Sequence, residues 1–197
     1  MKLTLQGLEN TWVRLEPLGA EHREDLRAAC AADPDTWNLL YPYSMLGEAF
    51  DRRWEDHLVK SQADGSWMQY AVMAGDRCMG MTCHIGADSA DASVEVGGTY
   101  YHPQVRGGAV NPAAKRLMMG HAFDSGARRV VYRVDAINAR SRAAVLKLGA
   151  VQEGILRQDR VTWTGRIRDT VIFSVLADEW PGVRDRLDAR LASFGPS

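Results

Sequence analysis

The feature that most restricts how this chain can fold is a pair of glycines directly before a helix, in HPQVRGGAVNPAAKRLMMGHAF, residues 102–123. Asn111 and Pro112 predict where that helix begins, because asparagine caps free backbone amides and proline at the first helical position loses no intrahelical hydrogen bond. Gly107 and Gly108 have no side chain, so their amides can approach another molecule closely. Amides beside the positive end of a helix favour a phosphate. A tight connection without a ligand is the commoner use of such glycines, so the loop alone leaves both interpretations open.

The glycines match neither of the two common nucleotide loops. A P-loop requires a lysine followed by serine or threonine after its second glycine, and no such pair follows here. The dinucleotide motif G-x-G-x-x-G lies between a strand and a helix of a parallel unit, whereas the strands expected before this loop are antiparallel. We therefore expect neither of these nucleotide-binding folds.

Strands and helices alternate along the chain. A period-two strand at 11–18 precedes two amphipathic helices, the second of which carries Phe50, Trp54, Leu58 and Val59 on one stripe. Three strands separated by short polar turns then predict an antiparallel meander, at 66–74, 77–86 and 92–101. After the helix from Asn111 come a strand, a helix closing at Gly149, two strands around the turn 163–165, and a terminal helix. Without a repeat or a flexible linker, residues 1–197 read as a single α/β domain.

Composition and charge exclude several classes of function. A net charge of −1 gives no general attraction for nucleic acid. The first residues lack the apolar core of a signal peptide, and no apolar run approaches the roughly 20 residues that span a bilayer. Cys30, Cys78 and Cys83 form no C-x-x-C pair, so we expect small buried residues and neither disulfides nor a metal site. The expectation is a cytoplasmic protein that binds neither membrane nor nucleic acid.

Several segments together resemble the GNAT family of N-acetyltransferases. QVRGGA (104–109) is similar to the Q/R-x-x-G-x-G/A loop with which that family holds the pyrophosphate of acetyl-coenzyme A (acetyl-CoA). VEVGGTYYHP resembles the family's fourth strand, and VDAINARSRAAVLKLGAVQEG its fifth strand and following helix. The segments GGAVNPAAK, NARSRAAVLKLGA, EGILR and GRIRDTVIFSVLADEWP are most similar to the RimJ/RimL branch, which acetylates protein N-termini. The resemblance implies an α/β (α+β) fold with a mixed sheet of about seven strands, splayed between the fourth and fifth and flanked by helices.

The same resemblance implies an enzyme that transfers acetyl from acetyl-CoA to a primary amine by direct attack in a ternary complex. A protein or peptide N-terminal amine is the first expectation for the acceptor. A small amine such as an antibiotic, polyamine or metabolite is the alternative, as is a non-catalytic module that only binds coenzyme A. A structural domain in which the glycines merely turn the chain is the third class. Whether the protein forms a homodimer stays open.

The resemblance assigns one group of residues to the cofactor. Backbone amides around the glycines would hold the pyrophosphate, the Asn138 side chain would hold the pantetheine arm, and Arg106, Arg140 or Arg142 could meet the ribose phosphate. The expected cofactor-binding residues are Thr99, Tyr100, Tyr101, Gln104, Val105, Arg106, Gly107, Gly108, Ala109, Val110, Asn138 and Ser141.

Two residues are the expected catalytic groups. Glu95 stands four residues before Thr99, where some GNAT enzymes place a catalytic base, and burial would raise its pKa toward the useful range. The alternative is a strand carboxylate paired with an arginine. Ser141 is the expected acid, because Val145 occupies the position where the family often has a tyrosine; a local helix-cap role is the alternative. Lesser candidates for the base are Asp159, Asp135 and His84.

The acceptor end is the least defined. In the GNAT fold the acceptor groove lies between the connection of the first two helices and the turn joining the last two strands. Trp37, Tyr41, Tyr43 and Trp163 occupy those segments and could form an aromatic rim. Packing at the domain edge or in a dimer contact is the alternative. Gly98 stands where many relatives carry tryptophan, which leaves the shape of the acyl end open.

Overall fold

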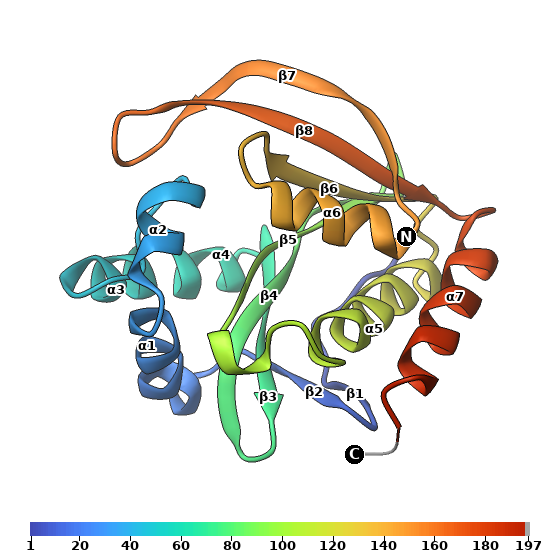
Figure 1. Cartoon of the computed structure of the whole chain (residues 1–197), viewed down its shortest axis with the longest axis horizontal. Helices are drawn as coiled ribbons and strands as arrows, with labels where there is room; N and C mark the ends of the chain where they lie inside the picture. The colour runs from blue at the N-terminus through green and yellow to red at the C-terminus, as the bar shows by residue number, and fades with distance from the viewer. Residues whose placement is uncertain (196–197) are drawn as a thin grey trace.

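The computed structural model describes residues 1–195, which build one eight-stranded sheet with helices on both faces (Figure 1). The strand order is β1-β2-β3-β4-β5-β6-β8-β7, in which only β5 and β6 run parallel. As predicted, β3, β4 and β5 form an antiparallel meander. The strands are β1 (Leu8–Asn10), β2 (Val13–Pro17), β3 (Trp67–Ala74), β4 (Arg77–Asp88), β5 (Ser93–Tyr101), β6 (Arg129–Asp135), β7 (Val151–Val161) and β8 (Ile167–Leu176).

The sheet has one strand more than expected. The additional strand is β1, three residues long, which pairs antiparallel with β2 across a tight turn. Its sequence, Leu-Glu-Asn, holds a single apolar residue and is too short to show a period-two pattern. The mixed sheet and its flanking helices otherwise agree with the expected GNAT fold.

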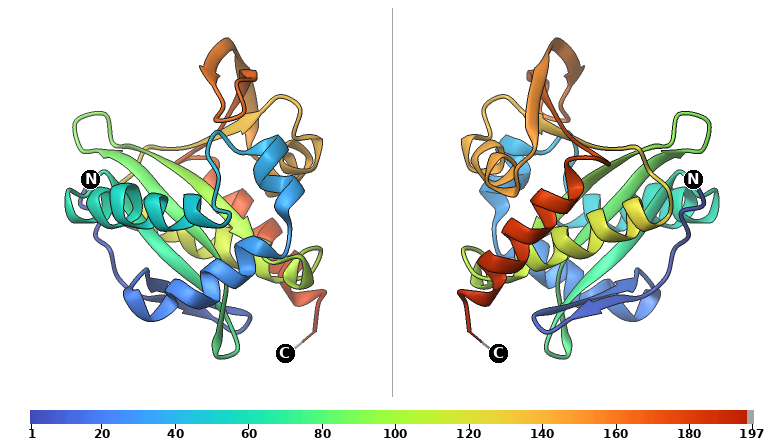
Figure 2. Two further views of the ribbon diagram at one scale, coloured as in Figure 1. Left: turned by 90° about the vertical axis from the view of Figure 1, so that its left-hand side faces the viewer. Right: turned by 90° about the vertical axis from the view of Figure 1, so that its right-hand side faces the viewer.

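Two layers of helices cover the sheet (Figure 2). Helices α5, α6 and α7 pack on one face around Met118, Leu148 and Leu187, and α1 to η2 pack on the other around Leu26 and Trp37. The helical segments are η1 (Ala20–His22), α1 (Arg23–Ala31), α2 (Pro34–Leu40), α3 (Glu48–Arg53), the π-helical η2 (Trp54–Val59), α4 (Lys60–Ala63), η3 (Pro103–Val105), α5 (Val110–Asp124), α6 (Ala139–Leu148) and α7 (Trp180–Ala192). Within residues 1–195 no helix has the length and apolar content needed to cross a membrane.

Two helix details differ from the expectation and one agrees. Phe50, Trp54 and Leu58 are buried as predicted, but Val59 is 49% exposed, because it follows Leu58 directly and lies off the stripe. Helix α6 ends as expected, at Gly149 in the left-handed conformation (φ 97°). The three cysteines are also free and buried, as predicted.

Helix α5 begins two residues earlier than the sequence predicts. Its N-cap is Ala109, which lacks a side-chain hydrogen bond to the helix, and Asn111 lies inside the first turn. Pro112 is tolerated there because the first turn has no intrahelical acceptor for its missing N–H. The cap assigned to Asn111 is therefore wrong, and the amides of the first turn are left without a side-chain cap.

The fold opens between β5 and β6. Their parallel pairing covers only Ser93–Glu95 against Arg129–Val131, and beyond Glu95 the two strands diverge. The pairing of β5 with β4 shifts register near Gly98, whose φ of 56° is a left-handed conformation that favours glycine. The expected splay between the fourth and fifth predicted strands is thus present, beside a bulge that bends β5.

Candidate active site

A cavity of about 860 Å³ lies where β5 and β6 separate. This volume falls within the usual range for small-molecule and cofactor sites. Its walls include residues 95–101 of β5, 132–135 of β6, the start of α6, the connection after α2, and the loop before α5. One cavity therefore joins the glycine loop to the part of β5 that carries Glu95.

The glycine loop presents open space to this cavity. Gly107 has a φ of 83°, and a Cβ added to either Gly107 or Gly108 would meet no atom within 4 Å. Of the expected cofactor residues, eight line the cavity: Thr99, Tyr100, Tyr101, Arg106, Gly107, Gly108, Asn138 and Ser141. The side chains of Val105, Ala109 and Val110 pack against the core, and Gln104 is exposed.

Arg106 anchors the loop to the body of the protein. Its guanidinium donates to the Tyr101 carbonyl (2.7 Å) and to the Asp33 carboxylate, and it lies over the Tyr100 ring. Although burial alone would raise the pKa of Asp33, hydrogen bonds from Thr36 and Arg106 hold it below its ordinary value. Because Asp33 also caps α2, this pair fixes the loop relative to that helix.

The tyrosines of the cavity differ in their partners. The Tyr100 hydroxyl donates to the Ala29 carbonyl (2.7 Å), so its side chain belongs to the core. Among the described residues, the buried hydroxyls of Tyr101 and Tyr132 have no hydrogen-bond partner. Burial raises the pKa of both, so they stay protonated. Buried hydroxyls without partners are unusual and fit a site that takes a polar ligand.

The start of α6 brings Asn138 and Ser141 together. Asn138 is the N-cap, and its Oδ1 accepts the Ser141 backbone N–H at 3.0 Å. No described residue makes a hydrogen bond with the Ser141 hydroxyl. Val145, one turn further, is buried in the cavity wall. The side-chain hydroxyl of this wall thus comes from Ser141 and not from position 145.

Glu95 lies half-buried in the cavity wall and forms no ion pair or hydrogen bond with a described side chain. Burial raises its pKa above the ordinary 4.5, while the fields of Arg133, Arg160 and Arg168 oppose that rise. Gly97 makes room for it, because a Cβ at Gly97 would lie 2.6 Å from the Glu95 Oε1. The predicted alternative, a carboxylate paired with an arginine, is therefore not the arrangement in this structure.

Sequence reasoning missed Lys115, on the cavity-facing side of α5. Its Nζ donates to the hydroxyls of Thr99 (2.6 Å) and Thr82 (3.2 Å), and the residue is only 5% exposed. Burial without a carboxylate partner lowers its pKa to about 7. The available signal was its place beside Ala114 and three residues before Met118, on the apolar stripe of α5.

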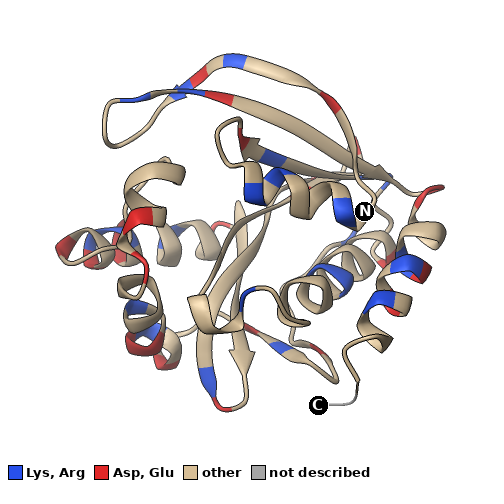
Figure 3. Ribbon diagram, viewed as in Figure 1, with Lys and Arg blue, Asp and Glu red and all other residues tan. Residues whose placement is uncertain are grey.

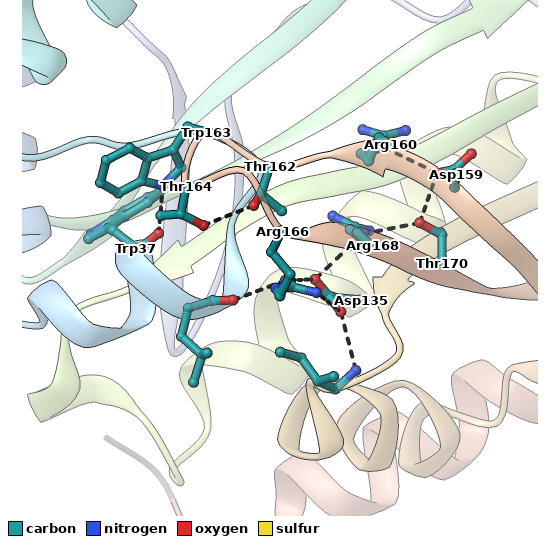
Figure 4. Close-up of polar contacts among 12 residues, drawn as sticks. Trp37, Asp135, Asp159, Arg160, Thr162, Trp163, Thr164, Arg166, Arg168 and Thr170 are labelled. Carbon is teal, nitrogen blue, oxygen red and sulfur yellow. Dashed lines mark hydrogen bonds and ion pairs between the residues drawn. The ribbon is translucent and has the colours of Figure 1, made fainter.

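The lesser candidates for the base have structural partners. Asp135 is buried and pairs with Arg166 (2.5 Å), and Asp159 accepts from Thr170 (2.8 Å) and Arg160 (3.1 Å) (Figure 4). His84 shares a hydrogen bond with the Met118 carbonyl (3.0 Å), and burial lowers its pKa to about 4. The ion pairs and hydrogen bonds of these three candidates therefore hold neighbouring groups in position.

The four predicted rim aromatics separate into two pairs. Tyr41 and Tyr43 line the cavity, and the Tyr41 hydroxyl donates to the Thr99 carbonyl. Trp37 is fully buried and stacks near Tyr100, and its indole N–H donates to the Cys30 carbonyl. Trp163 is half exposed, and its indole N–H donates to the Trp37 carbonyl (3.1 Å), which ties the β7–β8 turn to α2. Neither tryptophan is part of the cavity wall.

Comparisons with known proteins identify the family. Residues 13–151 match the family model for the acetyltransferase (GNAT) domain. A GCN5-related N-acetyltransferase from Brucella melitensis is 30% identical, with 97% of this chain and 87% of that chain covered and a TM-score of 0.88. Among curated proteins, none matches the chain by sequence.

Two more distant structures share the fold. Mycobacterium smegmatis RimJ in complex with CoA-disulfide is 20% identical, covers 93% of this chain and 92% of that chain, and has a TM-score of 0.79. The microcin C7 self-immunity acetyltransferase MccE, in complex with acetyl-CoA and AMP, is 17% identical, covers 88% and 98%, and has a TM-score of 0.77. The chain belongs to the GNAT family and is an acetyl-CoA-dependent N-acetyltransferase.

Proposed function

We propose that the acceptor is the N-terminal amine of a protein or peptide, and that the acetyl group passes to it directly while both substrates are bound. The observation that carries direct transfer is Glu95, a half-buried carboxylate without an ion-pair partner among the described residues, in the same cavity as Gly107 and Gly108. A carboxylate there can take a proton from an acceptor in the complex that holds the acetyl donor. The likeness to RimJ, with the segments similar to the RimJ/RimL branch, supports an N-terminal amine.

The cavity residues fit coenzyme A. The first turn of α5 has no side-chain cap, and the two glycines before it face open space. Amides from Gly107 to Val110 would hold the pyrophosphate, because such amides at a helix start bind phosphate well. The expected amides of Val105 and Arg106 already donate to the carbonyls of His102 and Pro103. Asn138 would hold the pantetheine arm through its side-chain N–H groups, which have no partner among the described residues. Bound acetyl-CoA supplies an acetyl group activated as a thioester.

Glu95 and Ser141 divide the proton transfers in this proposal. Glu95 takes a proton from the acceptor ammonium, directly or through a water molecule, and its raised pKa makes it a stronger base than an exposed glutamate. The amine nitrogen then forms the new bond to the acetyl carbon as the carbon–sulfur bond breaks. Ser141 would pass its hydroxyl proton to the departing sulfur and take up the second proton that the nitrogen loses, so that an amide and a free thiol are formed.

A small amine is the second candidate for the acceptor. MccE, whose solved complex contains acetyl-CoA and AMP, shares the fold at low identity. Tyr41 and Tyr43 line the cavity beside Glu95 and could accommodate a compact amine as well as a peptide end.

Release of free thiol from acetyl-CoA, measured with a panel of N-terminal peptides and small amines, tests the proposal. We expect turnover with at least one peptide and acetylation at its α-amine, verified by mass spectrometry. Turnover confined to small amines would contradict the assignment of the acceptor. Stabilisation by acetyl-CoA in a thermal shift experiment, without thiol release for any acceptor, would contradict transfer.

A further inference from the structure

Strand register places several charged residues on the face of the sheet that carries Glu95. Glu95 pairs with Val131 of β6, so Arg133, two residues further along β6, lies on the same face. Asp135 follows on that face and pairs with Thr170 of β8. Basic residues recur along β6, β7 and β8 in this part of the molecule (Figure 3).

A bulge in β7 adds a further arginine to this face. Gln158 has a φ of 51°, uncommon for a residue with a side chain, and its N–H donates to the Asp169 carboxylate at 2.7 Å. The pairing of β7 with β8 shifts register there, and Arg160 then pairs with Arg168. Bulges of this kind redirect side chains next to functional sites.

Arg168 is the most confined of these arginines. It is 6% exposed, lines the cavity, and donates from Nε to the Thr170 hydroxyl at 3.1 Å. The Asp135 carboxylate lies 3.7 Å from the same Nε, and its main partner is the Arg166 guanidinium. The terminal nitrogens of Arg168 make no hydrogen bond to a described residue, so this fork of donors in the cavity wall is left without acceptors (Figure 4). A buried guanidinium stays charged and gains most from a bidentate oxyanion.

Not every arginine of this region has a carboxylate partner. Arg133, Arg160, Arg166 and Arg168 lie near Asp135, Asp159 and Glu95, and Asp169 lines a small second cavity with Arg166 and Asp135. Arg166 and Arg160 have aspartate partners, whereas Arg133 forms no ion pair with a described residue. The Arg133 guanidinium is thus left without a carboxylate partner among the described residues, and a single carboxylate from a ligand is enough to compensate it.

We propose that Arg133 and Arg168, assisted by Arg160, bind a carboxylate of the acceptor, so that the preferred substrate is an amine that carries a carboxylate on a short chain. A peptide with an acidic first residue and a free amino acid both have this chemistry. The inference rests on the proposed function in one respect, namely that the acceptor amine reacts on the Glu95 side of β5. It goes further by assigning the acceptor a charge and a binding partner.

Matched acceptor pairs test the carboxylate preference. The first pair is a peptide with N-terminal glutamate and the same peptide with glutamine; the second is alanine and alaninamide. Preference for the acid in the first pair identifies an acidic side chain, and in the second an α-carboxylate. We expect kcat/KM to be at least about tenfold higher for the acid of one pair, as for a charge-assisted hydrogen bond. Equal kcat/KM within both pairs would overturn the proposal.

Arginine variants locate the preference. Arg133→Gln should reduce the acid-to-amide ratio of kcat/KM to near unity, because any change in the basicity of Glu95 affects both acceptors alike. Arg168→Lys keeps the charge but loses the fork, so an intermediate ratio is expected. Since Arg168 is buried, Arg133→Gln carries the test if the other variant does not fold. Arg184→Gln, on the exposed face of α7, is the matched control and should keep the full ratio. An unchanged ratio in Arg133→Gln would overturn the proposal.

A binding measurement separates this proposal from the proposed function. Calorimetry with the CoA complex and the two N-acetylated peptides, Glu-first and Gln-first, requires no turnover. If no acceptor reacts but the acidic product binds about tenfold more tightly and Arg133→Gln removes the difference, transfer fails as a function while the carboxylate site stands. If the two peptide products bind equally, or neither binds, and N-acetylalanine binds no more tightly than N-acetylalaninamide, the carboxylate site is overturned.

Discussion

The two faces of β5 place opposite charges in one cavity, one buried and one half-buried, and stabilise them by different means. On the α5 face, Lys115 contacts only hydroxyls and an aromatic ring, and burial lowers its pKa to about 7. On the other face, Glu95 lies within the field of three arginines without touching them, and burial raises its pKa. Both shifts bring the pKa of the group closer to neutral pH, and shifts of this kind are typical of functional sites. The difference is that Lys115 has only neutral partners, whereas the Glu95 face combines a carboxylate with several arginines.

The bulge at Gly98 lets β5 direct functional side chains to both faces of the sheet. The register shift in this part of β5 leaves Thr99 facing Lys115, while Glu95 and Gly97 face away. We expect the contacts of Lys115 to stabilise β5 on one face, and Glu95 to carry out the acid–base chemistry on the other. The following substitutions test that division, from the largest expected effect to the smallest.

Glu95→Gln should lower kcat/KM for acetyl transfer by about 10²- to 10³-fold, because it removes the general base but keeps the shape of the side chain. Acetyl-CoA binding, measured by calorimetry, should stay within about twofold of the wild type. Glu9→Gln, an exposed glutamate on β1, is the matched control. An effect on cofactor binding as large as that on kcat/KM would contradict the division.

Gly98→Ala should destabilise the protein by about 3 kcal/mol, since alanine is strained at this φ and its Cβ would lie 2.9 Å from Cys83 Sγ and 3.1 Å from the Trp67 ring. Gly107→Ala has a similar positive φ but open space, and should cost only about 1 kcal/mol. Denaturant unfolding of the two variants isolates the steric part. Equal losses would show that the bulge does not depend on close packing at Gly98.

Lys115→Met should change how stability depends on pH. The unfolded chain keeps the lysine proton up to about pH 10.5, whereas the folded chain releases it above about pH 7. Between these values the unfolded state binds more protons, so the wild type gains stability as pH rises. Relative to Lys115→Met, the free energy of unfolding should increase by about 2 kcal/mol from pH 7 to pH 9. A pH-independent difference in urea unfolding would mean that Lys115 stays charged when buried.

Ser141→Ala should have the smallest effect, a reduction in kcat of about two- to fivefold, because a thiolate leaves readily even without an acid. Steady-state kinetics with a saturating acceptor measures it, and Ser193→Ala on the exposed end of α7 is the control. A loss above about 100-fold would make Ser141 as important as Glu95 and place proton transfer on both sides of the cavity.

The sequence predicted the order of elements and the segments around the cavity, because long amphipathic helices and the glycine loop leave local patterns. It did not predict contacts between distant segments. Arg106 was expected at a phosphate, and its pairing with Asp33 depends on how α2 packs beside the loop. Trp37 was expected at a rim, yet the fold places it under Tyr100. Lys115 lies on the apolar stripe of α5, but its contacts with Thr82 and Thr99 depend on how the helix packs on the sheet.

The acceptor side was the hardest to predict for the same reason. The arginines whose charges act on Glu95 come from three further strands. One of these strands, β7, is redirected by a bulge at Gln158, where no glycine marks the bulge in the sequence. A single sequence shows neither the register of β7 against β8 nor the resulting position of Arg160 beside Arg168. These arginines lie close together only in the folded sheet.

A crystal structure of the protein with coenzyme A and a bound peptide acceptor tests the central claim most directly. The account predicts the acceptor nitrogen within hydrogen-bonding reach of Glu95 or of a water molecule that Glu95 holds, and the pyrophosphate on the amides of Gly107 and Gly108. An acceptor amine bound on the Lys115 side of β5, or a Glu95 carboxylate paired with an arginine and directed away from the amine, would contradict it.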